Sequence, residues 1–108
     1  MSQAQTEVSK EQIEASSQFG RIIHRCAVRI GSKTELGKRA GMSKEVIKSI
    51  TSGEAHNHNE EVLLRLARAV GDVVHKEDSR RLGGLIEQIA GRTMKIDRPG
   101  PLPYRERN

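Results

Sequence analysis

Aromatic residues, cysteines and long apolar runs are scarce in this sequence. Only Phe19 and Tyr104 among the 108 residues are aromatic, and hydrophobic residues make up 34%, so any core must be small and aliphatic. The single cysteine, Cys26, excludes an intramolecular disulfide and indicates a reducing compartment. No charged-then-apolar leader opens the chain and no run of about 20 apolar residues occurs. We therefore expect one small, soluble, cytoplasmic domain with tails and no membrane partner.

Residue sets typical of enzymes and metal sites are also missing. No Ser/His/Asp set, phosphate-binding glycine loop or paired carboxylates have the spacing that catalysis needs, so we expect no enzymatic activity. Residues 56–59, His-Asn-His-Asn, are better interpreted as a loop near phosphate than as a metal site, because no carboxylate pair is nearby. Cys26 lies on an apolar stripe and is interpreted as a small core residue. We expect neither a metal nor a cofactor.

The net charge of +5 is concentrated in one segment. Residues 20–53 carry eight Lys or Arg against two acidic residues, whereas residues 1–19 and 54–75 are net acidic. Such a concentration is typical of a surface that binds a polyanion. Three of these cations, Arg21, Arg25 and Arg29, follow one another at four-residue steps and so lie on one face of a helix. Two interpretations stay open for this face: it is simply exposed to solvent, or it contacts a DNA backbone.

Apolar spacing predicts an all-α protein. Four stripes with helical spacing cover residues 19–30, 36–40, 47–50 and 63–70, and each is closed by a glycine. A fifth stripe precedes Gly91, although Gly83 and Gly84 inside it cost roughly 2 kcal/mol relative to alanine. No alternating strand pattern is present. The pattern therefore predicts a compact bundle of four to five helices.

The same pattern divides the chain into four parts. Residues 1–17 are rich in Ser, Gln and Glu and are expected to form a flexible arm, either disordered or loosely helical. Residues 18–75 hold the compact domain, residues 76–96 an extra helix that serves dimerisation, and residues 97–108, which contain all three prolines, a disordered tail. We expect the dimer contact on the fifth stripe, which exceeds what a four-helix core can cover: Leu82, Leu85, Ile86 and Ile89.

Residues 33–53 predict two short helices joined by a tight turn. Gly41 suits the positive φ of such a turn, and Ser43 can cap the helix that follows. The apolar positions form an inward set, and the outward set is Lys38, Arg39, Lys44, Glu45, Lys48 and Ser49. A unit of this kind presents the N-terminal part of its second helix to the major groove of DNA.

This stretch resembles the helix-turn-helix of the phage-repressor/Cro family, also called the XRE family. The family pattern is matched by Leu36, Ala40, Gly41, Met42, Ser43, Ile47, Ile50 and Gly53, and residues 59–71, NEEVLLRLARAVG, are similar to its fourth helix. Gly37 departs from the family's usual alanine, and Thr51 replaces a common acidic residue. The resemblance covers about residues 19–75. It implies a lambda-repressor-like bundle and a transcriptional regulator, most typically a repressor, that binds double-stranded DNA as a homodimer.

The resemblance also implies roles for individual residues. Base-facing positions of the recognition helix, at about residues 43–51, are matched by Lys44, Glu45, Lys48 and Ser49. Lysine can donate to guanine, and glutamate can accept from cytosine; Glu45 can alternatively orient a neighbouring lysine. Phosphate-contacting positions are matched by Lys33, Thr34, Ser43 and Ser52, in keeping with the affinity of helix N-termini for phosphate.

Two other functions stay open. The chain can be the antitoxin of a toxin–antitoxin pair, which binds its own operator and neutralises a partner toxin through a tail. It can also be an interaction module that kept the fold without binding DNA, although the outward lysines argue against this. Binding of RNA or single-stranded DNA is disfavoured, because the aromatic side chains on which bases stack are nearly absent.

Overall fold

Residues 8–91 are described by the structure, a computed structural model, and within them every regular element is helical. The five α-helices are α2 (Lys10–Ile30), α3 (Lys33–Ala40), α4 (Lys44–Ser49), α5 (Glu60–Ala69) and α6 (Lys76–Ala90). Between α4 and α5 the chain makes two short helical turns, η1 (Ile50–Glu54) and η2 (Ala55–Asn57). The all-α prediction is confirmed. None of these helices is both long and apolar enough to cross a membrane.

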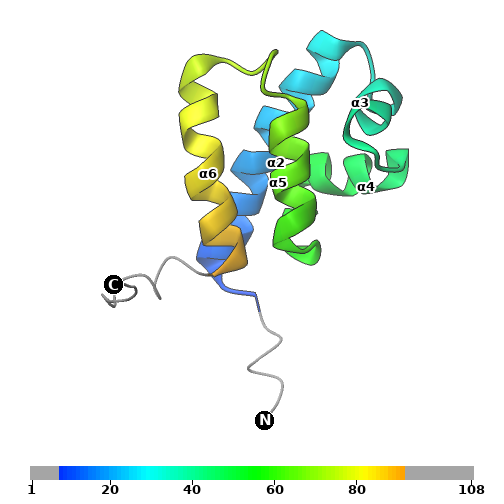
Figure 1. Cartoon of the computed structure of the whole chain (residues 1–108). Helices are drawn as coiled ribbons and strands as arrows, with labels where there is room; N and C mark the ends of the chain where they lie inside the picture. The colour runs from blue at the N-terminus through cyan, green and yellow to red at the C-terminus, as the bar shows by residue number, and fades with distance from the viewer. Residues whose placement is uncertain (1–7, 92–108) are drawn as a thin grey trace, which may run out of the picture.

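Helix α2 is the central element of the bundle. Figure 1 shows α5 and α6 in front of it, with α3 and α4 at the edge opposite α6. The core is a single aliphatic cluster around the fully buried Phe19, to which every α-helix contributes. Its largest buried side chains include Phe19, Ile22, Ile23, Leu36, Ile47, Ile50, Leu63, Leu66 and Ile86. The apolar stripes that predicted the helices are therefore the stripes that face the core.

The prediction of a flexible arm over residues 1–17 is wrong from residue 10 onward, because α2 begins there. Ser9 and Gln12 form a capping box: the Ser9 hydroxyl accepts from the Gln12 backbone N–H at 3.1 Å, and the Gln12 side chain accepts from the Ser9 N–H at 3.0 Å. Together these bonds satisfy two backbone donors that would otherwise have no partner. Ala15 and Ser16 are buried. Residues 1–7 lie outside the described part.

The prediction that the apolar face of α6 mediates dimerisation is also wrong. Leu82, Leu85, Ile86 and Ile89 are between 2% and 6% exposed and belong to the core of the single chain. Helices α2 and α5 supply the surface that covers them, since α6 packs against both. Gln12 fixes this contact through a 2.9 Å hydrogen bond from its Nε2 to the Ile89 carbonyl. Helix α6 ends at Gly91 (φ 72°) as predicted; residues 92–108, with the predicted tail, lie outside the described part.

A close backbone contact fixes the segment after α4 against α2. A Cβ atom at Gly20 would lie 2.5 Å from the Ile50 carbonyl oxygen and 3.3 Å from that of Thr51. Because real Cβ atoms do not approach backbone that closely, only glycine at position 20 permits this packing. Gly83 and Gly84, by contrast, are exposed on α6, and an added Cβ would meet nothing within 4 Å.

Alanine substitutions at these glycines should have opposite effects. We expect Gly20→Ala to lower the free energy of unfolding by about 1–3 kcal/mol, because the new methyl group must displace backbone. Gly83→Ala and Gly84→Ala should each raise it by about 0.5–1 kcal/mol, because alanine loses less entropy in a helix. Urea denaturation of the three variants measures both effects. A Gly20→Ala protein as stable as the other two would contradict the close contact.

Candidate nucleic-acid interface

Helices α3 and α4 are joined by the three-residue turn that the sequence predicts. Gly41 has φ 71°, in the left-handed region, and its N–H and that of Met42 bond back to the carbonyls of Lys38 and Gly37 at 3.4 and 2.8 Å. This is a Schellman motif, which closes the C-terminal end of α3. Ser43 then caps α4, where its hydroxyl accepts from the Val46 N–H at 3.3 Å. These hydrogen bonds thus fix the orientation of α4 relative to α3.

Gly37 lies close to the backbone of the turn between α3 and α4. A Cβ atom there would lie 2.6 Å from the Met42 carbonyl oxygen. The backbone of the turn therefore lies against α3 more closely than an alanine would allow.

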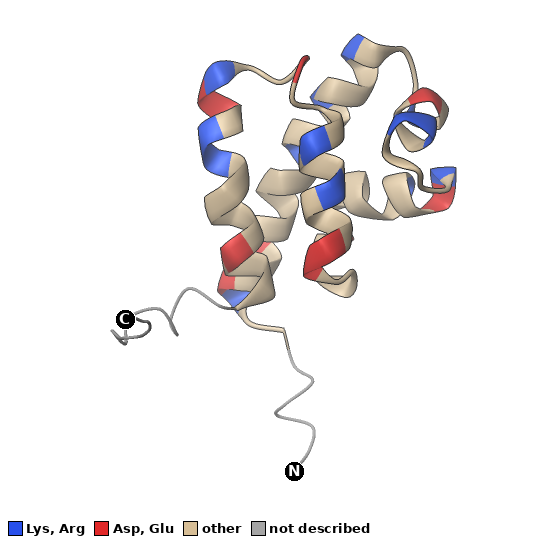
Figure 2. Ribbon diagram, viewed as in Figure 1, with Lys and Arg blue, Asp and Glu red and all other residues tan. Residues whose placement is uncertain are grey.

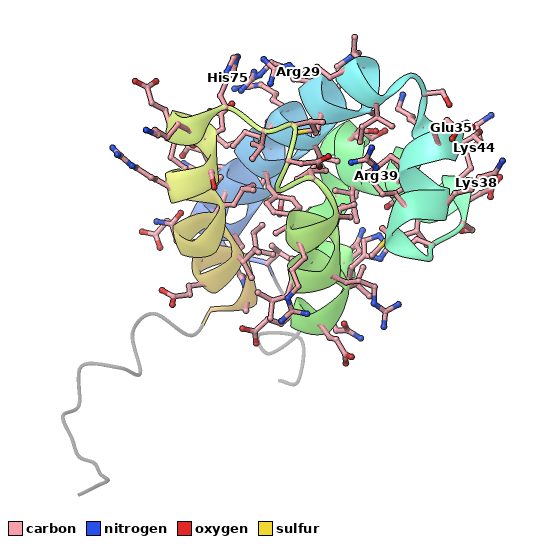
Figure 3. The ribbon with its side chains drawn as sticks, turned by 45° about the horizontal axis from the view of Figure 1, so that its top comes forward. Arg29, Glu35, Lys38, Arg39, Lys44 and His75 are labelled. Carbon is pink, nitrogen blue, oxygen red and sulfur yellow. The ribbon has the colours of Figure 1, made fainter. Side chains whose placement is uncertain are left out.

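Helix α4 is amphipathic, with its polar side toward solvent. Ile47 and the following Ile50 are fully buried, whereas Lys44, Glu45 and Lys48 are exposed. Figure 3 shows Lys44 at the outer end of the α3–α4 pair, close to Glu35 and Lys38. The last two form an ion pair at 3.8 Å. Three of the four side chains predicted to face bases therefore point into solvent from one short helix.

Ser49, the fourth predicted base-facing residue, is placed differently. It is half-buried, and its hydroxyl lies 3.2 Å from Glu54 Oε1 and 3.0 Å from His58 Nε2. A carboxylate can only accept, so the single hydroxyl proton goes to Glu54 and His58 must donate from Nε2. The Ser49 hydroxyl is thus engaged inside the protein and holds the end of α4 to the segment before α5.

The predicted phosphate-contacting residues lie at helix ends. Lys33 and Thr34 open α3, half-buried and exposed respectively, and Ser43 and Ser52 are exposed on either side of α4. The hydroxyl of Ser43 accepts a backbone bond, which leaves its proton free to be donated. Ser52 instead donates its only proton to the Lys48 carbonyl at 2.8 Å. Of the two serines, only Ser43 has a hydroxyl proton that no hydrogen bond within the described residues uses.

Several contacts that hold α3 and α4 in place were not predicted from the sequence. Glu54 and His58 hold Ser49, but their spacing from it follows no helical period. Arg39, placed in the outward set, forms an ion pair with Asp72 at 2.7 Å and so ties α3 to the end of α5. Arg25 and Arg29, for which a DNA contact stayed open, bond to residues of α6 and of the segment before it.

The side chains of His56 and Cys26 have internal surroundings. His56 Nδ1 lies 3.1 Å from the hydroxyl of the fully buried Ser16. Burial raises the pKa of the Cys26 thiol, so this side chain stays protonated and packs as a small core residue. In residues 8–91 no three His, Cys, Asp or Glu side chains are grouped so that they could hold a metal ion.

Comparison with known proteins gives no match for this chain among protein families, curated proteins or solved structures. Its function must therefore be inferred from its own residues. The most informative features are the exposed side chains of α3 and α4 and the hydrogen bonds that fix the two helices relative to each other.

Replacement of Ser49 tests whether its hydroxyl is held internally. Ser49→Ala removes both hydrogen bonds and leaves Glu54 and His58 without this partner, so the free energy of unfolding should fall by about 1–2 kcal/mol. Lys48→Ala is the control, because that exposed side chain forms no hydrogen bond or ion pair within the described residues, and it should change stability by less than about 0.5 kcal/mol. Equal stability of the two variants in urea denaturation would show that the hydroxyl is not engaged.

Proposed function

We propose that this chain is a sequence-specific regulator of transcription, a repressor with a lambda-repressor-like helix-turn-helix, that binds double-stranded DNA with α4 in the major groove. The observation that carries the proposal is the orientation of α4: one side is buried at Ile47, and the other presents Lys44, Glu45 and Lys48 to solvent. The hydrogen-bonded turn before it fixes this orientation. The major groove is wide enough for one α-helix.

The exposed side chains of α4 have the chemistry that base recognition requires. Lys44 and Lys48 can each donate to O6 or N7 of guanine, and Glu45 can accept from N4 of cytosine. Lys44 is the first residue of α4 and lies at its outer end. We therefore propose Lys44 as the principal side chain that contacts bases. Because the Ser49 hydroxyl is engaged internally, we propose three base readers in α4 rather than four.

Phosphate contacts on both sides of α4 would set its position in the groove. Lys33 and Thr34 lie in the first turn of α3, and the Ser43 hydroxyl has a free proton. Contacts of this kind fix the register of the protein on the duplex and carry no sequence information themselves. Ser52 can contribute only if its bond to the Lys48 carbonyl is exchanged for one to phosphate.

The charge on the surface formed by α3 and α4 favours binding to a preferred DNA sequence over binding to random DNA. We define the reading face as the outward residues of α3, α4 and the turn after them, without Arg39, whose charge is balanced by its ion pair with Asp72. These residues are four lysines and three glutamates: Lys33, Lys38, Lys44, Lys48, Glu35, Glu45 and Glu54. Figure 2 shows both signs mixed on these helices. A nearly neutral face attracts random DNA weakly. Its affinity would then depend on matched contacts with bases.

A single helix of this size reads too little sequence for a regulator. One recognition helix covers only about 4–6 base pairs of groove, so two copies on a twofold axis, with half-sites about 34 Å apart, would supply the remainder. We propose a homodimer on DNA for this reason. The apolar face of α6 is occupied within the chain, so the two copies would have to meet through another surface.

Two lysines allow base reading to be separated from phosphate anchoring. Lys44→Ala should weaken binding to the preferred operator by about 1–3 kcal/mol and to random DNA much less, because a base contact is lost. Lys33→Ala should weaken both about equally and lower the slope of log affinity against log salt by about one per half-site, because one fewer counterion is released. Titration of each variant with operator and random duplexes over a range of salt measures both quantities.

The melting temperatures of the two variants control for folding. Neither lysine belongs to the core cluster, so both variants should melt close to wild type. If Lys44→Ala and Lys33→Ala showed the same loss on operator and on random DNA, α4 would not read bases as proposed.

A further inference from the structure

The strongest positive charge of the described chain does not lie on the reading face. It lies along α2 and the first half of α6, on residues that we call the arginine seam. The seam carries six basic and two acidic residues: Arg21, Arg25, Arg29, Lys76, Arg80, Arg81, Glu77 and Asp78. Residues 8–91 contain fourteen Lys or Arg and eleven Asp or Glu, a net charge of +3. The seam alone carries +4, so the rest of the described chain is net negative.

Several of the seam arginines are held in place by hydrogen bonds. Arg25 lies 2.9 Å and Arg81 3.7 Å from the same carboxylate, that of Asp78, whose side chain is only 13% exposed. Arg29 donates to the Val73 carbonyl and to His75 Nε2 (Figure 3). Each guanidinium has five N–H donors, and those of Arg25 and Arg81 remain 48% and 49% exposed. The internal bonds therefore fix these groups while leaving donors for a ligand.

The spacing of the seam matches a regular row of negative charges. Arg21, Arg25 and Arg29 follow at four-residue steps, each a rise of about 6 Å along α2. The row therefore spans about 12 Å, over which one strand of duplex DNA presents about three to four phosphates. Guanidinium groups fit phosphate oxygens in a bidentate manner. Lys76 and Arg80, in the first half of α6, are exposed and form no hydrogen bond or ion pair in residues 8–91.

We propose that the arginine seam binds the sugar–phosphate backbone of duplex DNA without sequence preference. Figure 1 places α6 at the edge of the bundle opposite α3 and α4, so the stretch of DNA bound at the seam differs from the one beneath α4. The seam would supply the general attraction to DNA that the nearly neutral reading face lacks. This goes beyond the proposed function, because it requires no base contact by α4.

The test compares two double variants that lose the same charge. Lys76→Ala/Arg80→Ala removes two seam cations without breaking an internal bond. Lys10→Ala/Arg68→Ala, the matched control, removes two exposed cations that are also without hydrogen bonds or ion pairs among the described side chains, but lie elsewhere. The full-length proteins are titrated with a random-sequence duplex, a single-stranded RNA and polyglutamate over a range of salt. Thermal melting confirms that all of them fold.

We expect the seam variant to bind the random duplex about tenfold more weakly at 0.1 M salt, with a salt slope lower by about two, since two phosphate contacts are lost. The control should stay close to wild type. Equal losses in both variants would mean that only net charge matters and would overturn the inference. So would an unchanged duplex affinity, whether or not binding to RNA or polyglutamate falls.

The same titrations separate this inference from the proposed function. A wild-type protein that binds random duplex through the seam but shows no preferred sequence contradicts the proposed function alone. A protein whose operator preference depends on Lys44 but whose affinity for random duplex is unaffected by the seam variant contradicts this inference alone.

Discussion

The close approach of α2 to the end of α4 is the constraint on which the rest of this structure depends. At Gly20 the two backbones meet without an intervening side chain, and this contact sets how far α4 lies from the core. Because Ile47 and Ile50 are buried by it, Lys44 and Lys48 are turned outward. The other face of α2 is tied to α6 by Gln12 and Arg25. One long helix thus positions both charged surfaces.

Much of this fold could be predicted from the sequence because its signals are local. Apolar stripes of period 3.6 identified the helices, and Gly31, Gly41 and Gly91 marked helix ends that the structure confirms. The early start of α2 was also encoded locally, in the Ser9–Gln12 capping box, but the polar composition around it pointed to disorder. What composition could not show is that the apolar face of α6 would be buried within the chain, against α2 and α5.

The candidate site was predicted less completely, because some of its contacts are not periodic. The exposure of Lys44, Glu45 and Lys48 follows from the amphipathic pattern of α4. The engagement of Ser49 does not, since it depends on Glu54 and His58, which reach it from an irregular segment. The arginine seam was likewise visible only as a helix face in α2, and its other half, on α6, became adjacent through folding. A nearly neutral reading face and a basic seam would together separate sequence selection from general attraction to DNA.

Selection of bound duplexes from a random pool tests whether α4 reads base sequence on behalf of a dimer. We expect one enriched consensus that is palindromic, with half-sites whose centres lie about one helical turn of DNA, or a multiple of it, apart. The palindrome would reflect the twofold axis of the protein, and the information within each half-site would reflect the few exposed side chains of α4. A pool that remains random after repeated rounds, although the protein retains DNA, would contradict the claim.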